Sequence, residues 1–266
     1  MAVSYRTGIT ILQFIYFVPA GALALLLCFR QGWKSAASSW RFIVTLALLR
    51  VAGDIAYFIT LSHPTLGAYV TVMICDLMGL APLTLTCVGL LGRVNEASKI
   101  LPPRFFNLLS ITSLVGLIVG VVGAILAVDD STGASYSVNG EIQAALALFI
   151  AVFAMTLYCF ILQCAATARS PARRSALGHE TRILAAVGAS IPFLLVRLVY
   201  AAIADYGSDP AFNFFGGNVT INLCMGVLVE IIVTTICLTA GFLVPPPADQ
   251  VKQTCSRDAS AEVPSA

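Results

Sequence analysis

Seven long apolar runs constrain the fold of this chain more than any other feature of its sequence. Each run reaches the length of about 20 residues that an α-helix needs to cross a hydrocarbon layer of about 30 Å. Only 11% of the 266 residues are charged, whereas a soluble domain carries about 25%. The sequence therefore predicts an all-α, polytopic membrane protein in contact with the lipid bilayer. The predicted spans are Gly8–Phe29, Arg41–Leu61, Ala68–Leu91, Phe105–Val128, Glu141–Ala166, Arg182–Ala204 and Val219–Val244.

The distribution of basic residues predicts how the bundle is oriented. Lysine and arginine gather on one side of the membrane, within Arg30–Arg41, Arg93–Arg104, Arg169–Arg182 and Lys252–Arg257. The loops on the other side carry acidic residues such as Glu141 and Asp205, with Arg6 as their only basic residue. Because short cytoplasmic loops hold the positive excess, we expect a lumenal or extracellular amino terminus and a cytoplasmic carboxyl terminus.

Domain organisation follows from the same pattern. We expect residues 1–247 to form one membrane domain and residues 248–266, which are polar and follow a run of prolines, to form a disordered cytoplasmic tail. The eight cysteines show no CxxC or Cys/His ligand spacing, so they are interpreted as small apolar packing residues.

Several function classes find no support in the sequence. No basic stripe with interleaved aromatic residues indicates nucleic-acid binding. No phosphate-binding loop, dinucleotide fingerprint or serine nucleophile motif is present. His63 and His179 fall at opposite membrane faces, so we expect neither a histidine-based metal site nor a bound cofactor.

Five ionisable residues lie inside the predicted spans. An ionisable side chain in hydrocarbon costs about 2.5–3.5 kcal/mol on insertion scales, so it normally faces a protein interior, a cavity or a partner. With a helix rise of 1.5 Å per residue, all five fall in one slab in the central and outer part of the bundle. We therefore expect them to meet. They are Arg50 and Asp54 in the second span, Asp76 in the third, Arg197 in the sixth and Glu230 in the seventh.

The spacing of these residues predicts their partners. Arg50 and Asp54 are separated by four residues and can pair on one helix face, and Arg197 would then face Asp76 or Glu230. Two arginines and three carboxyls leave one carboxyl unmatched, for which the sequence favours Glu230 or Asp76. Desolvation would favour its neutral form.

Polar neighbours extend the set into a predicted cavity that opens toward the lumenal side. Tyr57 continues the Asp54 face of the second span, and Tyr200 lies one turn outward of Arg197. The alternative is that the ion pairs only fix helix register, without any ligand. In the seventh span a polar stripe recurs every four residues, at Asn218, Asn222, Gly226, Glu230 and Thr234.

Two resemblances follow from these residues. The stretches SIPFLLVRLVYA (Ser190–Ala201) and GVLVEIIV (Gly226–Val233) resemble a group of uncharacterised fungal seven-helix integral membrane proteins, many of which are encoded in secondary-metabolite gene clusters. More distantly, the acid of DIAY (Asp54–Tyr57) and the acid Glu230 are similar to those of the fungal membrane-bound meroterpenoid cyclases. Those cyclases carry Glu on the second helix and Asp on the seventh, the reverse of this chain. In them the two acids start cation cyclisation by protonating an epoxide or alkene.

The first functional hypothesis is a membrane-bound cyclase or isomerase of fungal secondary metabolism. It would act on a lipophilic terpenoid or polyketide intermediate in the endoplasmic reticulum or another endomembrane, beside other enzymes of the pathway. Asp54, Glu230 and Asp76 would be its catalytic acids. Its substrate-binding residues would be Arg50, Arg197, Tyr200, Tyr57 and Asn222.

The alternative hypothesis is a seven-helix receptor or transporter. It would bind an amphipathic or anionic ligand in the same charged pocket through Arg50 and Arg197.

Overall fold

The computed structural model describes residues 4–31, 37–63, 65–126, 140–170, 178, 180–206 and 218–244. Over these residues the chain is entirely helical, and seven of its helices are long and apolar enough to cross a membrane. The predicted all-α, seven-span architecture is therefore confirmed. The predicted tail, residues 248–266, together with Cys255 and His179, lies outside the described residues.

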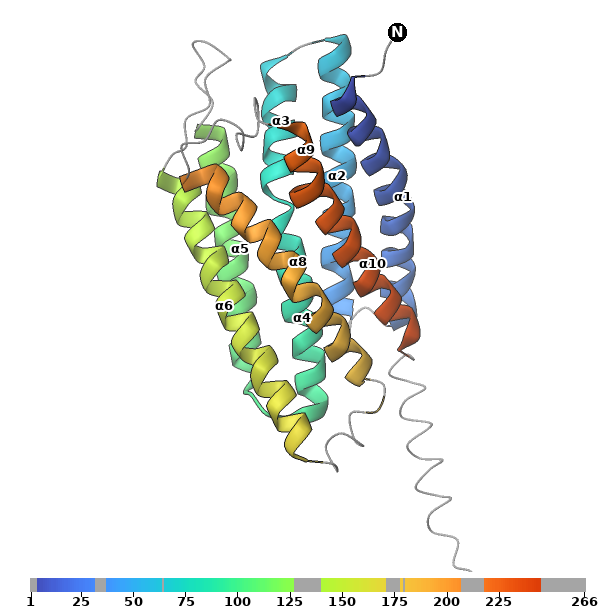
Figure 1. The fold of residues 1–266 in the computed structure, drawn as a ribbon, viewed down its shortest axis with the longest axis vertical. Coiled ribbons are helices and arrows are strands. Elements are labelled where there is room, and N and C mark those ends of the chain that lie inside the picture. Colours follow the sequence, from blue (N-terminus) through green and yellow to red (C-terminus); the bar gives the residue numbers. More distant parts are fainter. Residues whose placement is uncertain are drawn as a thin grey trace, which may run out of the picture.

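Five of the seven spans are single helices, and two are composite. In Figure 1 the spans run along the long axis, with α1 and α2 at one side and α5 and α6 at the other. The third span consists of α3 and α4, and the seventh consists of α9, the π-helical segment η3 and α10. The elements are α1 (Tyr5–Gln31), α2 (Ala37–Ser62), α3 (Leu66–Leu77), α4 (Leu80–Ser98), α5 (Pro103–Leu126), α6 (Gly140–Arg169), α8 (Glu180–Tyr206), α9 (Val219–Asn222), η3 (Leu223–Val227) and α10 (Leu228–Leu243).

The third span is the central element of the bundle. Of its most apolar window, 72% is buried inside the protein, against 28% to 50% for the other six spans. α4 contacts α2, α5, α6, α8 and α10. The other spans expose large apolar side chains such as Ile15, Leu48 and Leu108 on their outer faces, as expected of helices that face lipid.

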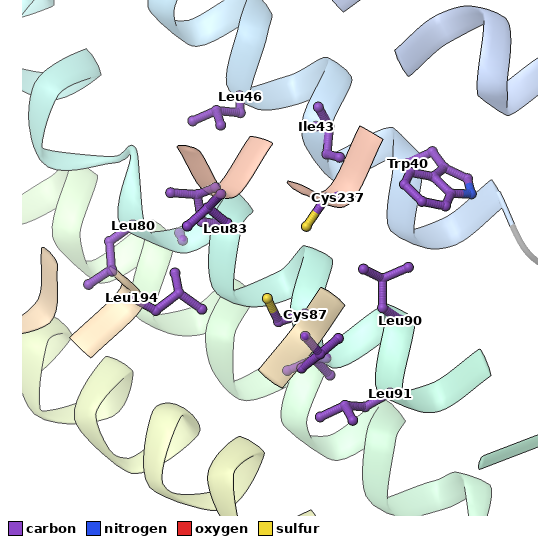
Figure 2. Close-up of a cluster of buried hydrophobic side chains, with 14 of the residues drawn as sticks. Trp40, Ile43, Leu46, Leu80, Leu83, Cys87, Leu90, Leu91, Leu194 and Cys237 are labelled. Atoms are coloured by element: carbon purple, nitrogen blue, oxygen red, sulfur yellow. The ribbon is translucent and has the colours of Figure 1, made fainter. Parts of the chain in front are cut away.

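A layer of buried apolar side chains fills the middle of the bundle. Figure 2 shows Ile43 and Leu46 of α2, Leu83 of α4 and Leu194 of α8 converging in this layer. Cys87 and Cys237 lie within it, fully buried. Cys28, Cys75 and Cys159 are also buried and unbridged, whereas Cys164 is half-buried and Cys224 is exposed. The interpretation of the cysteines as packing residues therefore holds for the five buried ones.

The two ends of the bundle are named by the position of the first helix. The amino-terminal end is the end at which α1 begins, marked N in Figure 1. α2, α5 and α8 end there, and α3, α6 and α9 begin there. Which end faces the cytoplasm stays a prediction from the loop charges.

Candidate functional site

Arg50 of α2 is the centre of a buried ion-pair network. It is 4% exposed, and its Nε donates to Oε2 of Glu230 at 2.6 Å while its second terminal nitrogen binds Oε1 of the same carboxylate. Its first terminal nitrogen donates to Oδ1 of Asp76 at 2.6 Å. The two-point contact of Arg50 with Glu230 is the strongest geometry between an arginine and a carboxylate. The ion pairs of Arg50 tie α2 to α3 through Asp76 and to α10 through Glu230.

Arg197 of α8 joins the same network from the other side. Its Nε donates to Oε1 of Glu230 at 3.3 Å, and a terminal nitrogen donates to the backbone carbonyl of Asp76 at 3.0 Å. Its guanidinium carbon lies 5.4 Å from the ring centre of the buried Tyr200, within the range of a cation–π contact. Glu230 is thus fully buried and shared by two arginines. We call Arg50, Asp54, Asp76, Arg197 and Glu230 the charge cluster.

Asp54 is the member of the charge cluster that the others do not satisfy. Its side chain is 5% exposed, and its Oδ2 has no hydrogen-bond donor among the described residues. The expected local pair between Arg50 and Asp54 is wrong, because Arg50 directs its three nitrogens to Asp76 and Glu230. A pair with the arginine on the N-terminal side is also the weaker order at this spacing. The unmatched carboxyl is therefore Asp54, and the expectation of Glu230 or Asp76 is wrong.

A small polar cavity adjoins Asp54. It measures about 30 Å³, enough for one or two water molecules. Of the residues expected around a polar cavity, Tyr57 and Asn222 line it, while Tyr200 and Arg197 do not. Arg6 and Gln13 of α1 contribute to it as well and were not predicted, because α1 carries no charge inside its apolar run. The lining is Arg6, Ile9, Thr10, Gln13, Arg50, Gly53, Asp54, Tyr57, Val72, Asp76, Val219 and Asn222.

The outer part of this cavity is polar and lies toward the amino-terminal end. The Tyr57 hydroxyl and Thr7 Oγ1 are 3.2 Å apart, and the Arg6 guanidinium carbon lies 6.0 Å from the Tyr57 ring centre. Arg6 and Thr7 belong to the first turn of α1. A proton or a water molecule that reaches Asp54 from this end would therefore pass Arg6 and Tyr57.

The third span is interrupted beside the charge cluster. A continuous helix is predicted over Ala68–Leu91, but α3 ends at Leu77, a turn occupies Met78 and Gly79, and α4 begins at Leu80. A β-carbon on Gly79 would collide with Oε1 of Glu230 and with a terminal nitrogen of Arg50. Only a residue without a side chain leaves room for this ion pair. The sequence signal is Gly79 followed by Pro82, a helix stop followed by a proline suited to the first turn of a new helix.

The seventh span widens just before Glu230. Residues Leu223–Val227 form a π-helical turn between α9 and α10, and such turns are frequent at functional sites. In a regular helix of 3.6 residues per turn a stripe with a period of four drifts by about 40° at each step. A wider turn reduces this drift and brings Asn222 to the cavity while Glu230 and Thr234 stay buried. The period-four stripe was the sequence signal for this irregularity.

A second buried polar group lies near the other end of the bundle. Arg93 of α4 donates to both oxygens of Glu180 at 3.1–3.2 Å and to the side-chain carbonyl of Gln31. The Gln31 amide donates to the backbone carbonyls of Gly241 and Val244 at 3.0 and 3.4 Å. We call Gln31, Arg93 and Glu180 the clamp, since they join α1, α4, α8 and α10. From the sequence Arg93 is predicted to be a loop charge, so the clamp was not expected.

Within the described part of the chain no group of three or more His, Cys, Asp or Glu side chains is arranged to hold a metal ion.

The chain is similar to known proteins at the level of a sequence family and of a solved structure. No curated protein matches its sequence. Among solved structures, the crystal structure of Exiguobacterium sibiricum rhodopsin is similar to it, with 13% sequence identity, a TM-score of 0.49, and coverage of 91% of this chain and 95% of that chain. A family model described as domain of unknown function DUF7702 matches residues 3–246. This match covers nearly the whole chain, so the protein belongs to the DUF7702 family.

Proposed function

We propose that this multi-pass membrane protein is a receptor or transporter that works with a proton, taken up at Asp54 from the amino-terminal end of the bundle. The observation that carries the proposal is the Asp54 carboxyl, which is buried, has an oxygen without a hydrogen-bond donor among the described residues, and lines a water-sized cavity. An unpaired buried carboxylate is costly unless it accepts a proton or meets a cation.

The size of the cavity supports a proton over an organic ligand. Pockets that hold drug-sized molecules measure about 300–1,000 Å³, whereas the cavity beside Asp54 measures about 30 Å³. Water in such a cavity can carry a proton to the carboxyl, but the cavity has no room for a terpenoid or polyketide.

The ion pairs also argue against an anionic ligand on Arg50 and Arg197, the binding mode expected for a receptor or transporter from the sequence. Every side-chain nitrogen of Arg50 already has a carboxylate partner, and Arg197 contacts Glu230 and the Asp76 carbonyl. An anion would first have to displace Asp76 or Glu230.

Two backbone irregularities give the site elements that can change shape. The turn at Met78 and Gly79 and the π-helical segment η3 both border the charge cluster. Discontinuous helices at mid-membrane are a recurring feature of transporters, where they bind ions and move. A change in the charge of Asp54 would act on α2 and α3 next to the first of these irregularities.

The test is infrared difference spectroscopy of the full chain in lipid nanodiscs, between mildly acidic and mildly alkaline buffer. A protonated carboxyl has a carbonyl band that its carboxylate lacks. We expect one such band to disappear in Asp54→Asn and to move in frequency in Asp54→Glu. Glu96→Gln removes an exposed carboxyl of α4 and serves as the control that keeps the band. A spectrum of Asp54→Asn identical to that of the unmodified chain would refute the proposal.

An experiment in sealed vesicles then distinguishes a transporter from a receptor. A pH-sensitive dye inside reconstituted vesicles reports proton movement across the membrane. A transporter dissipates an imposed pH gradient and loses this activity in Asp54→Asn, whereas a receptor binds the proton without dissipating the gradient.

A membrane cyclase is the second candidate, favoured by the same unpaired carboxyl. In this proposal the cavity of about 30 Å³ widens to admit a lipophilic intermediate of fungal secondary metabolism, in an endomembrane, and Asp54 donates a proton to it. Glu230, the other acid implied by the resemblance, is held by two arginines, which disfavours its service as a proton donor. Deletion of the gene followed by metabolite profiling tests the candidate: an uncyclised precursor that accumulates and disappears on complementation supports it, and an unchanged profile opposes it.

A further inference from the structure

Asp205 is a second buried carboxyl that the charge cluster does not include. It is predicted from the sequence to be a loop residue, but it lies in the last turn of α8. Its side chain is 6% exposed, and Oδ1 has no hydrogen-bond donor among the described residues. Buried polar atoms are nearly always hydrogen-bonded, so this oxygen calls for a partner such as a proton or water.

A separate cavity connects Asp205 with Arg197. It measures about 40 Å³, room for roughly two or three water molecules. Of the described residues that line it, Arg197 and Asp205 are the two with polar side chains. The remaining lining is Leu77, Leu80, Gly120, Ile142, Ala145, Leu146, Phe149 and Ala201. Two turns of α8, about 12 Å of helix rise, separate the two residues.

Arg197 therefore borders the cavity of Asp205 while it contacts Glu230 and the Asp76 carbonyl. The contact with Glu230 is made through Nε at 3.3 Å, and the Asp76 carbonyl lies at 3.0 Å. The 3.3 Å contact is long for a charge-assisted hydrogen bond, which normally measures about 2.7–2.9 Å. Arg197 is thus held less tightly on Glu230 than Arg50 is.

In the described part of the chain, few charges compete for Asp205. From α6, the Gln143 amide approaches the backbone carbonyl of Asp205 at 3.5 Å, and the exposed Glu141 lies in the first turn of that helix. α3 and α4 contribute only Leu77 and Leu80 to the shared cavity, and α5 contributes Gly120. Among the residues that the structure describes, Arg197 is the one cation that lines this cavity.

We propose that Asp205 is a second proton-binding carboxyl that shares Arg197 with Glu230 across this cavity. When Asp205 is ionised it draws the guanidinium away from Glu230, and when it is protonated it releases the guanidinium back. The inference rests on the proposed function in assuming that protons reach the charge cluster, but it concerns a different carboxyl and a different cavity from those of Asp54.

The experiment uses the full chain in nanodiscs with nitrogen-15-labelled arginine, so that infrared bands of the guanidinium groups are identified by their isotope shift. In the unmodified chain we expect a carboxyl band and a guanidinium band that change together with pH. Asp205→Asn should remove both changes and leave the band assigned to Asp54. Asp205→Glu should keep both, with the carboxyl band moved in frequency. Glu141→Gln, an exposed carboxyl at the same end of the bundle, is the matched control and should keep the original spectrum.

The outcomes separate the two proposals. If Asp205→Asn leaves the carboxyl and guanidinium changes intact, the inference about Asp205 is wrong, whatever Asp54 does. If Asp54→Asn changes nothing while Asp205→Asn removes both bands, the proposed role of Asp54 fails and the second site stands. If Asp205→Asn does not fold, Asp205→Glu decides: an unmoved carboxyl band overturns the inference.

Discussion

Two groups of buried charge in this protein, the charge cluster and the clamp, differ in how completely they are satisfied. In the clamp, Arg93 binds both oxygens of Glu180 and the Gln31 side chain, and Gln31 in turn binds two carbonyls at the end of α10. In the charge cluster, Asp54 keeps an oxygen without a donor among the described residues and lines a cavity. A helix break and a π-helical turn border only the charge cluster.

An apolar layer keeps the two groups apart. On α4 the 14 positions from Gly79 to Arg93 correspond to about 21 Å of helix, and Leu83, Cys87 and Leu90 lie between them (Figure 2). Substitutions in one group should therefore not affect the other, and the effects of buried charge can be measured separately in each. Burial and a bordering cavity are common to both groups, since Arg93 also lines a cavity. Within these two groups, the carboxyl oxygen without a donor among the described residues and the irregular backbone belong to the charge cluster.

Substitution of Glu230 should have the largest effect on stability. Glu230→Gln removes the negative charge that two buried arginines share, and breaking a buried pair in this way costs about 3–5 kcal/mol. Thermal unfolding in detergent, followed with a dye that reacts with thiols as the buried Cys87 and Cys237 become accessible, measures the loss. Glu96→Gln, on an exposed side chain, is the control, and an equal loss in both variants would contradict the assignment of Glu230 to the network.

Substitution of Glu180 should be costly for stability but neutral for proton binding. Glu180→Gln leaves Arg93 with the Gln31 carbonyl as a remaining acceptor, so we expect a loss of about 3 kcal/mol. The pH-dependent carboxyl bands should be unchanged, since the clamp lies beyond the apolar layer. Loss of those bands in Glu180→Gln would show that the two groups are coupled and would remove the distinction drawn between them.

A methyl group on Gly79 should disturb the charge cluster by overpacking. Gly79→Ala places a β-carbon against Glu230 and Arg50, and forced repacking of this kind costs about 1–3 kcal/mol. Gly67→Ala is a matched control in the first turn of α3, where nothing lies within 4 Å of the added carbon. The comparison is made by thermal unfolding and by the position of the carboxyl bands, which should change in Gly79→Ala alone. Equal behaviour of the two variants would argue against a tight turn at Gly79.

Asp54→Asn should have the smallest effect on stability, because no hydrogen bond to Oδ2 is lost. The same substitution should abolish the carboxyl band assigned to this residue. A loss of stability comparable to that of Glu230→Gln would mean that Asp54 is a structural partner of Arg50, and the contrast with the clamp would fail.

The sequence was sufficient for the architecture because each apolar run has only one stable solution in lipid, a spanning helix. It was also sufficient to bring Arg50, Asp76, Arg197 and Glu230 to one level, since helix rise alone sets depth. It was not sufficient for their pairing. Arg50 has a neighbour four residues away on its own helix, and only the tertiary arrangement of α2, α3 and α10 decides that two carboxylates from other helices take the place of that neighbour.

The same limit applies at the ends of the spans. Arg93, Glu180 and Asp205 lie just outside the apolar runs, and the loop-charge rule therefore treated them as solvated. In the structure the helices continue beyond the apolar runs, so all three are buried. Apolar runs underestimate helix length where charges satisfy one another or line a cavity.

The turn at Met78 and Gly79 also changes the electrostatics of the third span. It divides one long helix into two, and each helix carries about half an elementary charge at its ends, positive at the first turn and negative at the last. The negative end of α3 meets Arg197 through the Asp76 carbonyl, and the positive end of α4 begins beside Glu230. The backbone thus supplies a partial negative and a partial positive charge at mid-membrane, which an unbroken helix could not do and which no count of ionisable side chains would include.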